Sequence, residues 1–242
     1  MKYSRAVQPS GKKMDMALLI AVIAACLIGL CAIFSATRSY ESNTNVIVQG
    51  GAFCIGLALC ILLSKFDYEQ YGLWTKYIYG FCVAILVLVL FIGKSGDWGA
   101  QSWIRIGPIG IQPSEIAKVG FILTFSWHLT RVEQTLNKPL TLLGLLAHIG
   151  VLAGLIMLQP DAGSTMVFAF IFIVLIFAAG LSWRYIIPAG ILGMVSLPLI
   201  YIFGLSKFQK HRIQVFFHPN LDPLGSGYNV IQSKIAVGSG QI

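Results

Sequence analysis

The chain has 242 residues, of which 57% are hydrophobic and only 11% are charged, with a formal net charge of +8. This composition excludes a water-soluble globular domain, in which about 25% of the residues are charged. It predicts a protein that crosses a membrane several times, because the bulk of such a chain is solvated by lipid.

Seven apolar segments predict an all-α fold, a polytopic membrane bundle of about seven transmembrane helices. A helix needs about 20 apolar residues to cross the hydrocarbon core, where every backbone N–H and C=O must be paired without water. The fourth segment is the shortest and the most polar. In chain order, the expected spans are about Met16–Ala36, Val46–Ser64, Lys76–Gly93, Ser114–Leu129, Thr141–Leu158, Gly163–Leu181 and Tyr185–Gly204.

The expected organisation is an N-terminal segment at 1–15, one membrane domain at 16–204 and a large outer loop at 205–242. The first apolar run lacks the cleavage site of a signal peptide and is expected to remain as an anchor. Nine Lys and Arg residues flank the predicted inner ends of the spans, against four at the outer ends before the loop. Because cytoplasmic segments are enriched in Lys and Arg, we expect a cytoplasmic N-terminus and a periplasmic or extracellular loop.

The segment from Lys94 to Pro113 carries aromatic and basic side chains between the third and fourth spans. Its glycines argue against a regular helix, and its tryptophans suit the level of the lipid headgroups. One interpretation is an interfacial re-entrant loop. The other makes Trp103 and Arg105 a platform and a cation for a lipid-linked substrate, and the residues alone leave both open.

The fourth span opens with Pro113, Ser114 and Glu115. Ser114 is the expected N-cap, and the Glu115 carboxylate suits the positive end of the helix. Lys118 lies three residues further on and on the same face, so we expect a buried ion pair or a lysine that faces a polar pathway. A structural pair and a substrate-binding role fit this pattern equally well.

Gln159, Pro160 and Asp161 repeat this arrangement between the fifth and sixth spans. Pro160 ends one helix, and Asp161 is expected to cap the next. His128 and His148 lie within spans four and five. Each is interpreted as a packing histidine and not as a metal ligand, since neither has a partner at ligand spacing.

The outer loop combines a turn with a concentration of charge. Asn220 to Gly227 is turn-forming sequence around Asp222, the only carboxylate after Asp161. An acid among several cations either balances their charge or serves as a general base. From Tyr228 the sequence is amphipathic at helical spacing, which predicts a short interfacial helix. The cations of the loop are Lys207, Lys210, Arg212 and Lys234.

Three motifs in this order resemble the SEDS family (shape, elongation, division, sporulation), with RodA as the nearest branch and FtsW and SpoVE as relatives. The resemblance implies a ten-helix bundle of which this chain holds the first seven helices, truncated at its C-terminus. His218 and Ala162 depart from the family, which often has Asp and Leu there. The motifs are Trp103-Ile-Arg-Ile-Gly with Ile111-Gln-Pro-Ser-Glu-Ile-Ala-Lys118, Gln159-Pro-Asp-Ala-Gly163, and Asp222-Pro-Leu-Gly-Ser-Gly-Tyr-Asn-Val-Ile-Gln-Ser-Lys-Ile-Ala-Val-Gly-Ser-Gly240.

The resemblance further implies a peptidoglycan glycosyltransferase of the bacterial inner membrane that polymerises lipid II into glycan strands. Its implied partners are lipid II, membrane lipids and a class B penicillin-binding protein acting as transpeptidase, with no nucleic acid. Asp222 is then the expected catalytic base. The expected substrate-binding residues are Trp103, Arg105, Glu115, Lys118, Asp161, Lys210, Arg212, Gln232 and Ser233.

No metal-binding residue and no resident cofactor are predicted, although a divalent cation, Mg2+ or Mn2+, would help the basic residues to stabilise a departing pyrophosphate. Two other functions remain open. In a lipid II flippase, Glu115 and Lys118 would line the headgroup route and Asp222 would be dispensable for chemistry. A non-catalytic scaffold would instead hold the penicillin-binding protein through its outer loops.

Overall fold

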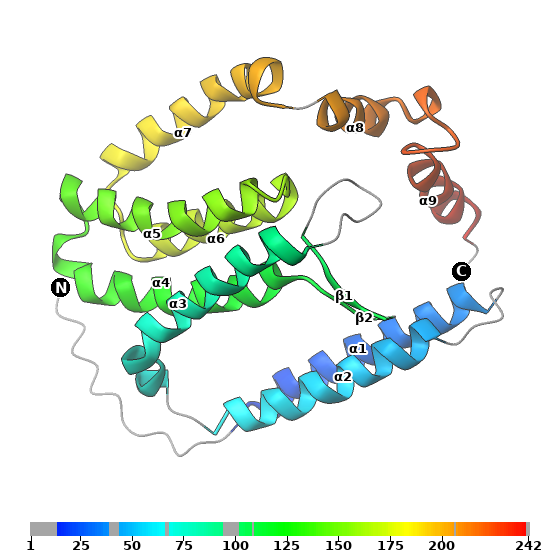
Figure 1. Ribbon diagram of the computed structural model, residues 1–242, viewed down its shortest axis with the longest axis horizontal. Helices are drawn as coiled ribbons and strands as arrows, with labels where there is room; N and C mark the ends of the chain where they lie inside the picture. The colour runs from blue at the N-terminus through cyan, green and yellow to red at the C-terminus, as the bar shows by residue number, and fades with distance from the viewer. Residues whose placement is uncertain are drawn as a thin grey trace. The chain divides into compact units, whose positions relative to one another are not determined.

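The structure is a computed structural model, and it describes residues 14–38, 44–65, 68–93, 102–107, 109–205 and 207–240. Most of the predicted N-terminal segment and the loop at 94–101 lie outside the described residues. The elements, labelled in Figure 1, are α1 (Met16–Thr37), α2 (Thr44–Leu63), α3 (Tyr68–Ile92), β1 (Ile104–Ile106), β2 (Ile109–Ile111), α4 (Pro113–Val132), η1 (Glu133–Thr135), α5 (Pro139–Met157), α6 (Ala162–Ala178), α7 (Trp183–Leu199), η2 (Ile200–Gly204), α8 (Lys207–Phe217), η3 (Pro219–Leu221) and α9 (Tyr228–Ser239).

The predicted helical membrane bundle is confirmed, because each of the seven expected spans coincides with one helix from α1 to α7. Four helices of the described part are long and apolar enough to cross a membrane: α1, α2, α5 and the Thr75–Ile92 part of α3. Helix α4 has 20 residues but includes Glu115, Lys118 and Arg131, which lower its hydropathy. Helices α6 and α7 are apolar and have 17 residues each. The chain is therefore a membrane protein with several spans.

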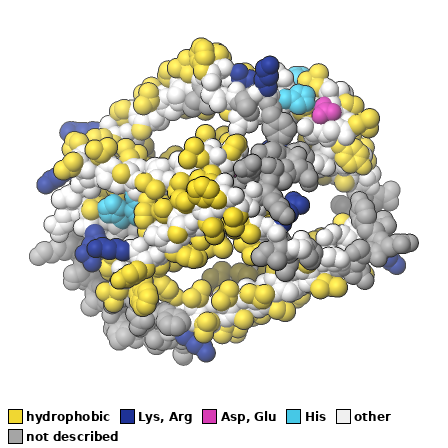
Figure 2. Space-filling model, in the orientation of Figure 1, with side chains coloured by type: hydrophobic (Ala, Val, Ile, Leu, Met, Phe, Trp, Pro, Cys, Tyr) yellow, Lys and Arg dark blue, Asp and Glu magenta, His cyan; other side chains and the backbone are white. Residues whose placement is uncertain are grey.

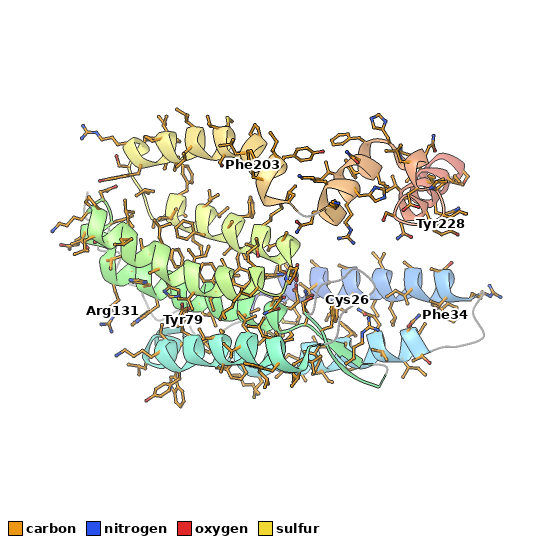
Figure 3. The ribbon with its side chains drawn as sticks, turned by 45° about the horizontal axis from the view of Figure 1, so that its top comes forward. Cys26, Phe34, Tyr79, Arg131, Phe203 and Tyr228 are labelled. Atoms are coloured by element: carbon orange, nitrogen blue, oxygen red, sulfur yellow. The ribbon has the colours of Figure 1, made fainter. Side chains whose placement is uncertain are left out.

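Contacts divide the chain into two compact units, Met1–Gly180 and Leu181–Ile242. In the first unit, α3 to α6 pack against one another, and α1 lies alongside α2 (Figure 1). Helices α1 and α2 bury no residue. Their exposed apolar side chains, among them Cys26 and Phe34 in Figure 3, suit a surface that lipid solvates. The expected limits of the membrane domain and of the outer loop stay predictions.

The core of the first unit is built from large side chains on α3 to α6. Phe121 stacks on Phe125 with ring centroids 5.0 Å apart and contacts the tilted ring of Phe168 at 5.4 Å. Aromatic pairs in this geometry add to the apolar area that they bury. The completely buried apolar side chains of the four helices are Leu86, Val89, Ala117, Phe121, Phe125, Leu145, Leu152, Ile156 and Phe168.

Two glycines allow α3 and α4 to approach closely. A Cβ atom at Gly120 would collide with the Cys82 thiol of α3, and one at Gly72 would collide with the indole ring of Trp127 on α4. The helices therefore pack through backbone at these two positions, as expected where small residues line a helix interface in a membrane.

The segment before α4 forms a β-hairpin, which the interpretation as an irregular interfacial loop did not include. Strands β1 and β2 pair in antiparallel register, with Arg105 opposite Gly110. Gly107 adopts φ +61°, which glycine reaches at no steric cost and which the turn requires. The Trp103 ring packs over Gly110, where a Cβ atom would lie 3.1 Å from Cε3 of the indole. Short-range pairing thus replaces the helix that these glycines disfavour.

The second unit is an apolar helix followed by a more polar segment. Helix α7 contains Pro188 and Pro198 and runs directly into the π-helical turn η2. Proline cannot donate a backbone hydrogen bond, so Pro198 interrupts the α-helical pattern just before the π-helical turn begins. The short helix predicted from Tyr228 is confirmed as α9, whereas α8 was not predicted.

Candidate functional site

Asp161 caps α6 and also joins it to α4. Its Oδ1 accepts a hydrogen bond from the Ser164 amide at 3.0 Å, which confirms the predicted cap. Its Oδ2 accepts from the Ser164 hydroxyl at 2.7 Å and from Nε2 of Gln112 at 2.9 Å. Gln112, Ser114, Asp161 and Ser164 thus form a polar cluster between the starts of α4 and α6. The carboxylate is thus bound on both oxygens by protein donors, while its predicted contact with substrate stays a prediction.

The expectation that Ser114 caps α4 was wrong. The N-cap residue is Gln112, and Pro113 begins the helix at a position where its missing N–H costs nothing. Ser114 is completely buried, and its Oγ lies 3.4 Å from Oγ of Ser164 on α6. The local pattern favoured a cap, but the neighbouring helix offered the hydroxyl a partner that the sequence does not reveal.

Gln159 extends this polar region toward α3. Its side chain is 1% exposed, and Nε2 donates to the Leu86 carbonyl at 3.3 Å. Its Oε1 finds no hydrogen-bond partner among the described residues. Buried acceptors are normally paired, so this oxygen is an exception within the described part of the chain.

Glu115 and Lys118 form the predicted ion pair, with Nζ 2.8 Å from Oε1. The pair lies on the surface of the protein and is not buried, because the Glu115 side chain is 58% exposed and that of Lys118 21%. An exposed pair contributes little to stability, at most about 1 kcal/mol. These charges are therefore available to a ligand, and their substrate-binding role stays a prediction.

Asp222 is held by the turn that follows it, as the turn-forming sequence predicted. Its Oδ2 accepts from the Ser226 amide at 2.8 Å, and its Oδ1 accepts from the Gly225 amide at 3.1 Å. Nε2 of His211 lies 3.6 Å from Oδ2. Figure 2 shows an acidic side chain beside a histidine in this part of the molecule. The Asp222 side chain remains 34% exposed, so the carboxylate is fixed but accessible.

The loop lowers the pKa of Asp222 below the ordinary carboxyl value of 3.8. The hydrogen bond from the Ser226 amide is the largest cause, and the side chain of His211 and the Gly225 amide act in the same direction, while desolvation partly opposes them. Asp222 is consequently ionised at neutral pH. His211 was not singled out from the sequence, and the only available signal was its place in the basic segment.

The other predicted residues of the tail have separate surroundings. Lys210 donates to the Ile202 carbonyl at 2.7 Å and lies 6.0 Å from the Tyr201 ring centroid, so it supports the π-helical turn. Arg212 is exposed on α8. On α9, Gln232 is exposed, and Ser233 donates to the Asn229 carbonyl at 2.7 Å within its own helix. In the first unit, Arg105 is exposed on β1 and Trp103 is partly buried beside it.

His128 and His148 are packing histidines, as interpreted, but they are not solitary. Their Nδ1 atoms lie 3.1 Å apart, and Nε2 of His148 is 3.2 Å from the Thr124 hydroxyl. The Tyr79 hydroxyl donates to the His148 carbonyl at 2.9 Å. Facing helices supply the partners that sequence spacing did not reveal. Within the described ranges, no three His, Cys, Asp or Glu side chains lie close enough together to hold a metal ion.

These features define a polytopic α-helical membrane protein with charged and hydrogen-bonding residues at helix ends, in a β-hairpin and in the segment that follows α7. The chain belongs to the FtsW/RodA/SpoVE family of cell cycle proteins, whose family model matches residues 15–242. The resemblance deduced from the three motifs is thereby confirmed.

Similar proteins support this assignment. The peptidoglycan glycosyltransferase MrdB of Escherichia coli K12 is 34% identical over 190 residues, which cover 78% of this chain and 51% of MrdB. The probable peptidoglycan glycosyltransferase FtsW of Trichlorobacter lovleyi is 30% identical over 237 residues, which cover 93% of this chain and 61% of that protein. The chain thus spans about half to two thirds of the length of these relatives.

Two solved structures resemble the fold. A chain of a peptidoglycan synthase complex is 31% identical and has a TM-score of 0.73, covering 94% of this chain and 66% of that one. RodA of Thermus thermophilus is 28% identical and has a TM-score of 0.62, covering 77% of this chain and 59% of that one.

Proposed function

We propose that this chain belongs to a peptidoglycan glycosyltransferase that joins lipid II units into glycan strands. The observation that carries the proposal is the Asp222 carboxylate, which two amides of its own turn hold in place while it stays accessible and ionised. The names of the E. coli and T. lovleyi relatives support the reaction class.

The proposed reaction is a displacement at the anomeric carbon of one lipid II by the sugar 4-hydroxyl of another. Asp222 accepts the hydroxyl proton as the new C–O bond forms. The bond between the anomeric carbon and the pyrophosphate oxygen breaks, and undecaprenyl pyrophosphate leaves with the electron pair, so the configuration inverts. Because a carboxylate of low pKa is a weak base, proton transfer accompanies bond formation and does not precede it.

The departing pyrophosphate requires cations, and the basic residues predicted from the sequence are the candidates for this role. Arg105, Lys118 and Arg212 are exposed or partly exposed, and guanidinium groups bind phosphate oxygens through two hydrogen bonds. Two of the candidate ammonium groups already donate hydrogen bonds, that of Lys210 to the Ile202 carbonyl and that of Lys118 to Glu115. A divalent cation, Mg2+ or Mn2+, would take most of its ligands from pyrophosphate oxygens and water, since such ions bind through few carboxylates.

The proposal includes a location and a partner. We place the protein in the bacterial inner membrane with its N-terminus in the cytoplasm and residues 205–242 outside. The similarity to a chain of a peptidoglycan synthase complex supports a class B penicillin-binding protein as the partner that crosslinks the strands.

Polymerisation of fluorescent lipid II by the purified protein in liposomes tests the proposal. We expect glycan strands that muramidase digests to disaccharide units. Movement of the lipid II headgroup across the bilayer without strands would instead establish a flippase. If neither strands nor movement occurs, while the protein binds a class B penicillin-binding protein, the scaffold function is correct and the glycosyltransferase proposal is wrong.

A further inference from the structure

Gln112 is the single residue between strand β2 and helix α4. Its backbone is extended, with φ −102° and ψ 109°, as expected for a residue that precedes proline. The direction in which the β-hairpin leaves the helix bundle is therefore set at this residue.

The side chain of Gln112 is fastened to a helix from a distant part of the chain. Nε2 lies 2.9 Å from Oδ2 of Asp161 and 3.4 Å from Oγ of Ser164. Asp161 is itself immobilised by the Ser164 amide and hydroxyl. The hydrogen bond thus joins the exit of the hairpin to the N-terminus of α6.

The hairpin contains little that would hold it in place by itself. Each strand has three residues, and an isolated two-stranded hairpin is at best marginally stable. Next to this hairpin's β1, the Trp103 ring covers Gly110 of β2. Arg105 of β1 lies opposite Gly110, and its side chain is exposed. A fixed point at the base of β2 consequently limits where Arg105 can lie.

We propose that Gln112 is a positioning residue, whose hydrogen bond to Asp161 fixes the hairpin so that Arg105 meets the phosphate groups of the substrate. This inference rests on the proposed glycosyltransferase function. Asp161 then acts through Gln112 and does not contact the substrate, which gives its carboxylate a role different from the one predicted from sequence.

Steady-state kinetics with lipid II provide the first test. Loss of one hydrogen bond corresponds to a factor of about three to ten, so Gln112→Ala should raise KM by that factor and change kcat less than about twofold. Gln134→Ala is the matched control, because Gln134 is an exposed glutamine in η1. Equal KM values for the two variants would overturn the proposal.

A double substitution separates positioning from a general loss of stability. Gln112→Glu alone places two carboxylates against each other and should raise KM at least as much as Gln112→Ala. Gln112→Glu combined with Asp161→Asn restores one donor and one acceptor, and asparagine still caps the helix. We expect KM to return to within about twofold of the parent value. A double variant that is no better than Gln112→Glu would contradict the inference.

Hydrogen exchange measured by mass spectrometry tests the positioning role of Gln112 independently of the proposed glycosyltransferase function. Amides of residues 104–111 should exchange about three to ten times faster in Gln112→Ala and Gln112→Glu, and at the parental rate in the double variant. If the parent protein makes no glycan but these rates change as expected, the proposed function is wrong and the hydrogen bond still fixes the hairpin. Unchanged hairpin rates would show that Gln112 does not position it.

Discussion

Asp161 and Asp222 show how two aspartates with the same local chemistry acquire different surroundings. Each accepts a hydrogen bond from a backbone amide three residues further along the chain. Oδ2 of Asp161 also accepts from the Ser164 hydroxyl and from Gln112, the residue before α4, so protein donors occupy both carboxylate oxygens. Among the described residues, the Gly225 and Ser226 amides of its own turn donate to Asp222, which faces His211 with a third of its side chain exposed.

The difference is the one expected between a structural carboxylate and the proposed general base. A carboxylate that joins two packed helices contributes to stability and loses its freedom to receive a proton. A carboxylate held by a surface turn keeps its orientation and an open side, which general base catalysis requires. The contrast predicts opposite effects of substitution at the two sites.

The largest effect is expected at Asp222. Asp222→Asn should lower the rate of glycan polymerisation at least about 100-fold, because a positioned general base contributes about 10²- to 10⁴-fold. Lipid II polymerisation by purified protein measures it, with thermal unfolding to show that the fold is kept. Glu133→Gln, at an exposed carboxylate in η1, is the control. Polymerisation at the parental rate by Asp222→Asn would remove it as the base.

A stability change is expected instead at Asp161. Asp161→Ala removes the cap of α6 and the bond to Gln112 together, which should lower the free energy of unfolding by about 2 kcal/mol. Asp161→Asn keeps an acceptor for the Ser164 amide and should cost much less. Thermal unfolding in one detergent compares the two variants, and equal losses would show that the acceptor kept by asparagine does not stabilise α6.

The turn around Asp222 should tolerate no side chain at Gly225. A Cβ atom there would collide with the Asp222 carboxylate, so Gly225→Ala must displace it. We expect polymerisation to fall about tenfold, as displaced catalytic groups lose rate steeply. Gly238→Ala, where a Cβ atom meets nothing within 4 Å, is the control in α9. Full activity of Gly225→Ala would mean that the position of the carboxylate is not critical.

The exposed ion pair should contribute almost nothing to stability. Glu115→Gln is expected to change the free energy of unfolding by less than about 1 kcal/mol, because the Glu115 side chain is 58% exposed. If Glu115→Gln lowered the free energy of unfolding as much as Asp161→Ala, the ion pair would be a structural interaction like that of Asp161.

The smallest effect concerns pH. The depressed pKa of Asp222 means that its ionised form stabilises the turn above the ordinary value of 3.8, and this contribution disappears only as pH falls through the lower folded value. Between pH 7 and about 5, His211→Gln and the double variant His211→Gln/Asp222→Asn should therefore show parallel stability profiles, because the neighbouring imidazole is absent from both. Divergence of the two melting curves within that range would mean that the turn does not hold the ionised carboxylate.

Local features of the fold were largely predictable. The apolar spans appeared as α1 to α7, Asp161 capped its helix, and the turn at Asp222 formed where prolines and glycines surround it. The hairpin was missed because its strands have three residues each, too few for an alternating pattern. Ser114 was misassigned because capping sequences describe only local partners.

The sequence by itself determined which segments enter the membrane, since hydrocarbon tolerates only apolar helices with paired backbones. It also predicted the turn that holds the Asp222 carboxylate, because prolines and glycines favour a turn through local interactions. Only the tertiary structure decided that Gln112 meets Asp161, that Ser114 meets Ser164 and that His128 meets His148. Those pairs lie between 20 and 50 residues apart in sequence, and packed helices bring them within hydrogen-bonding distance.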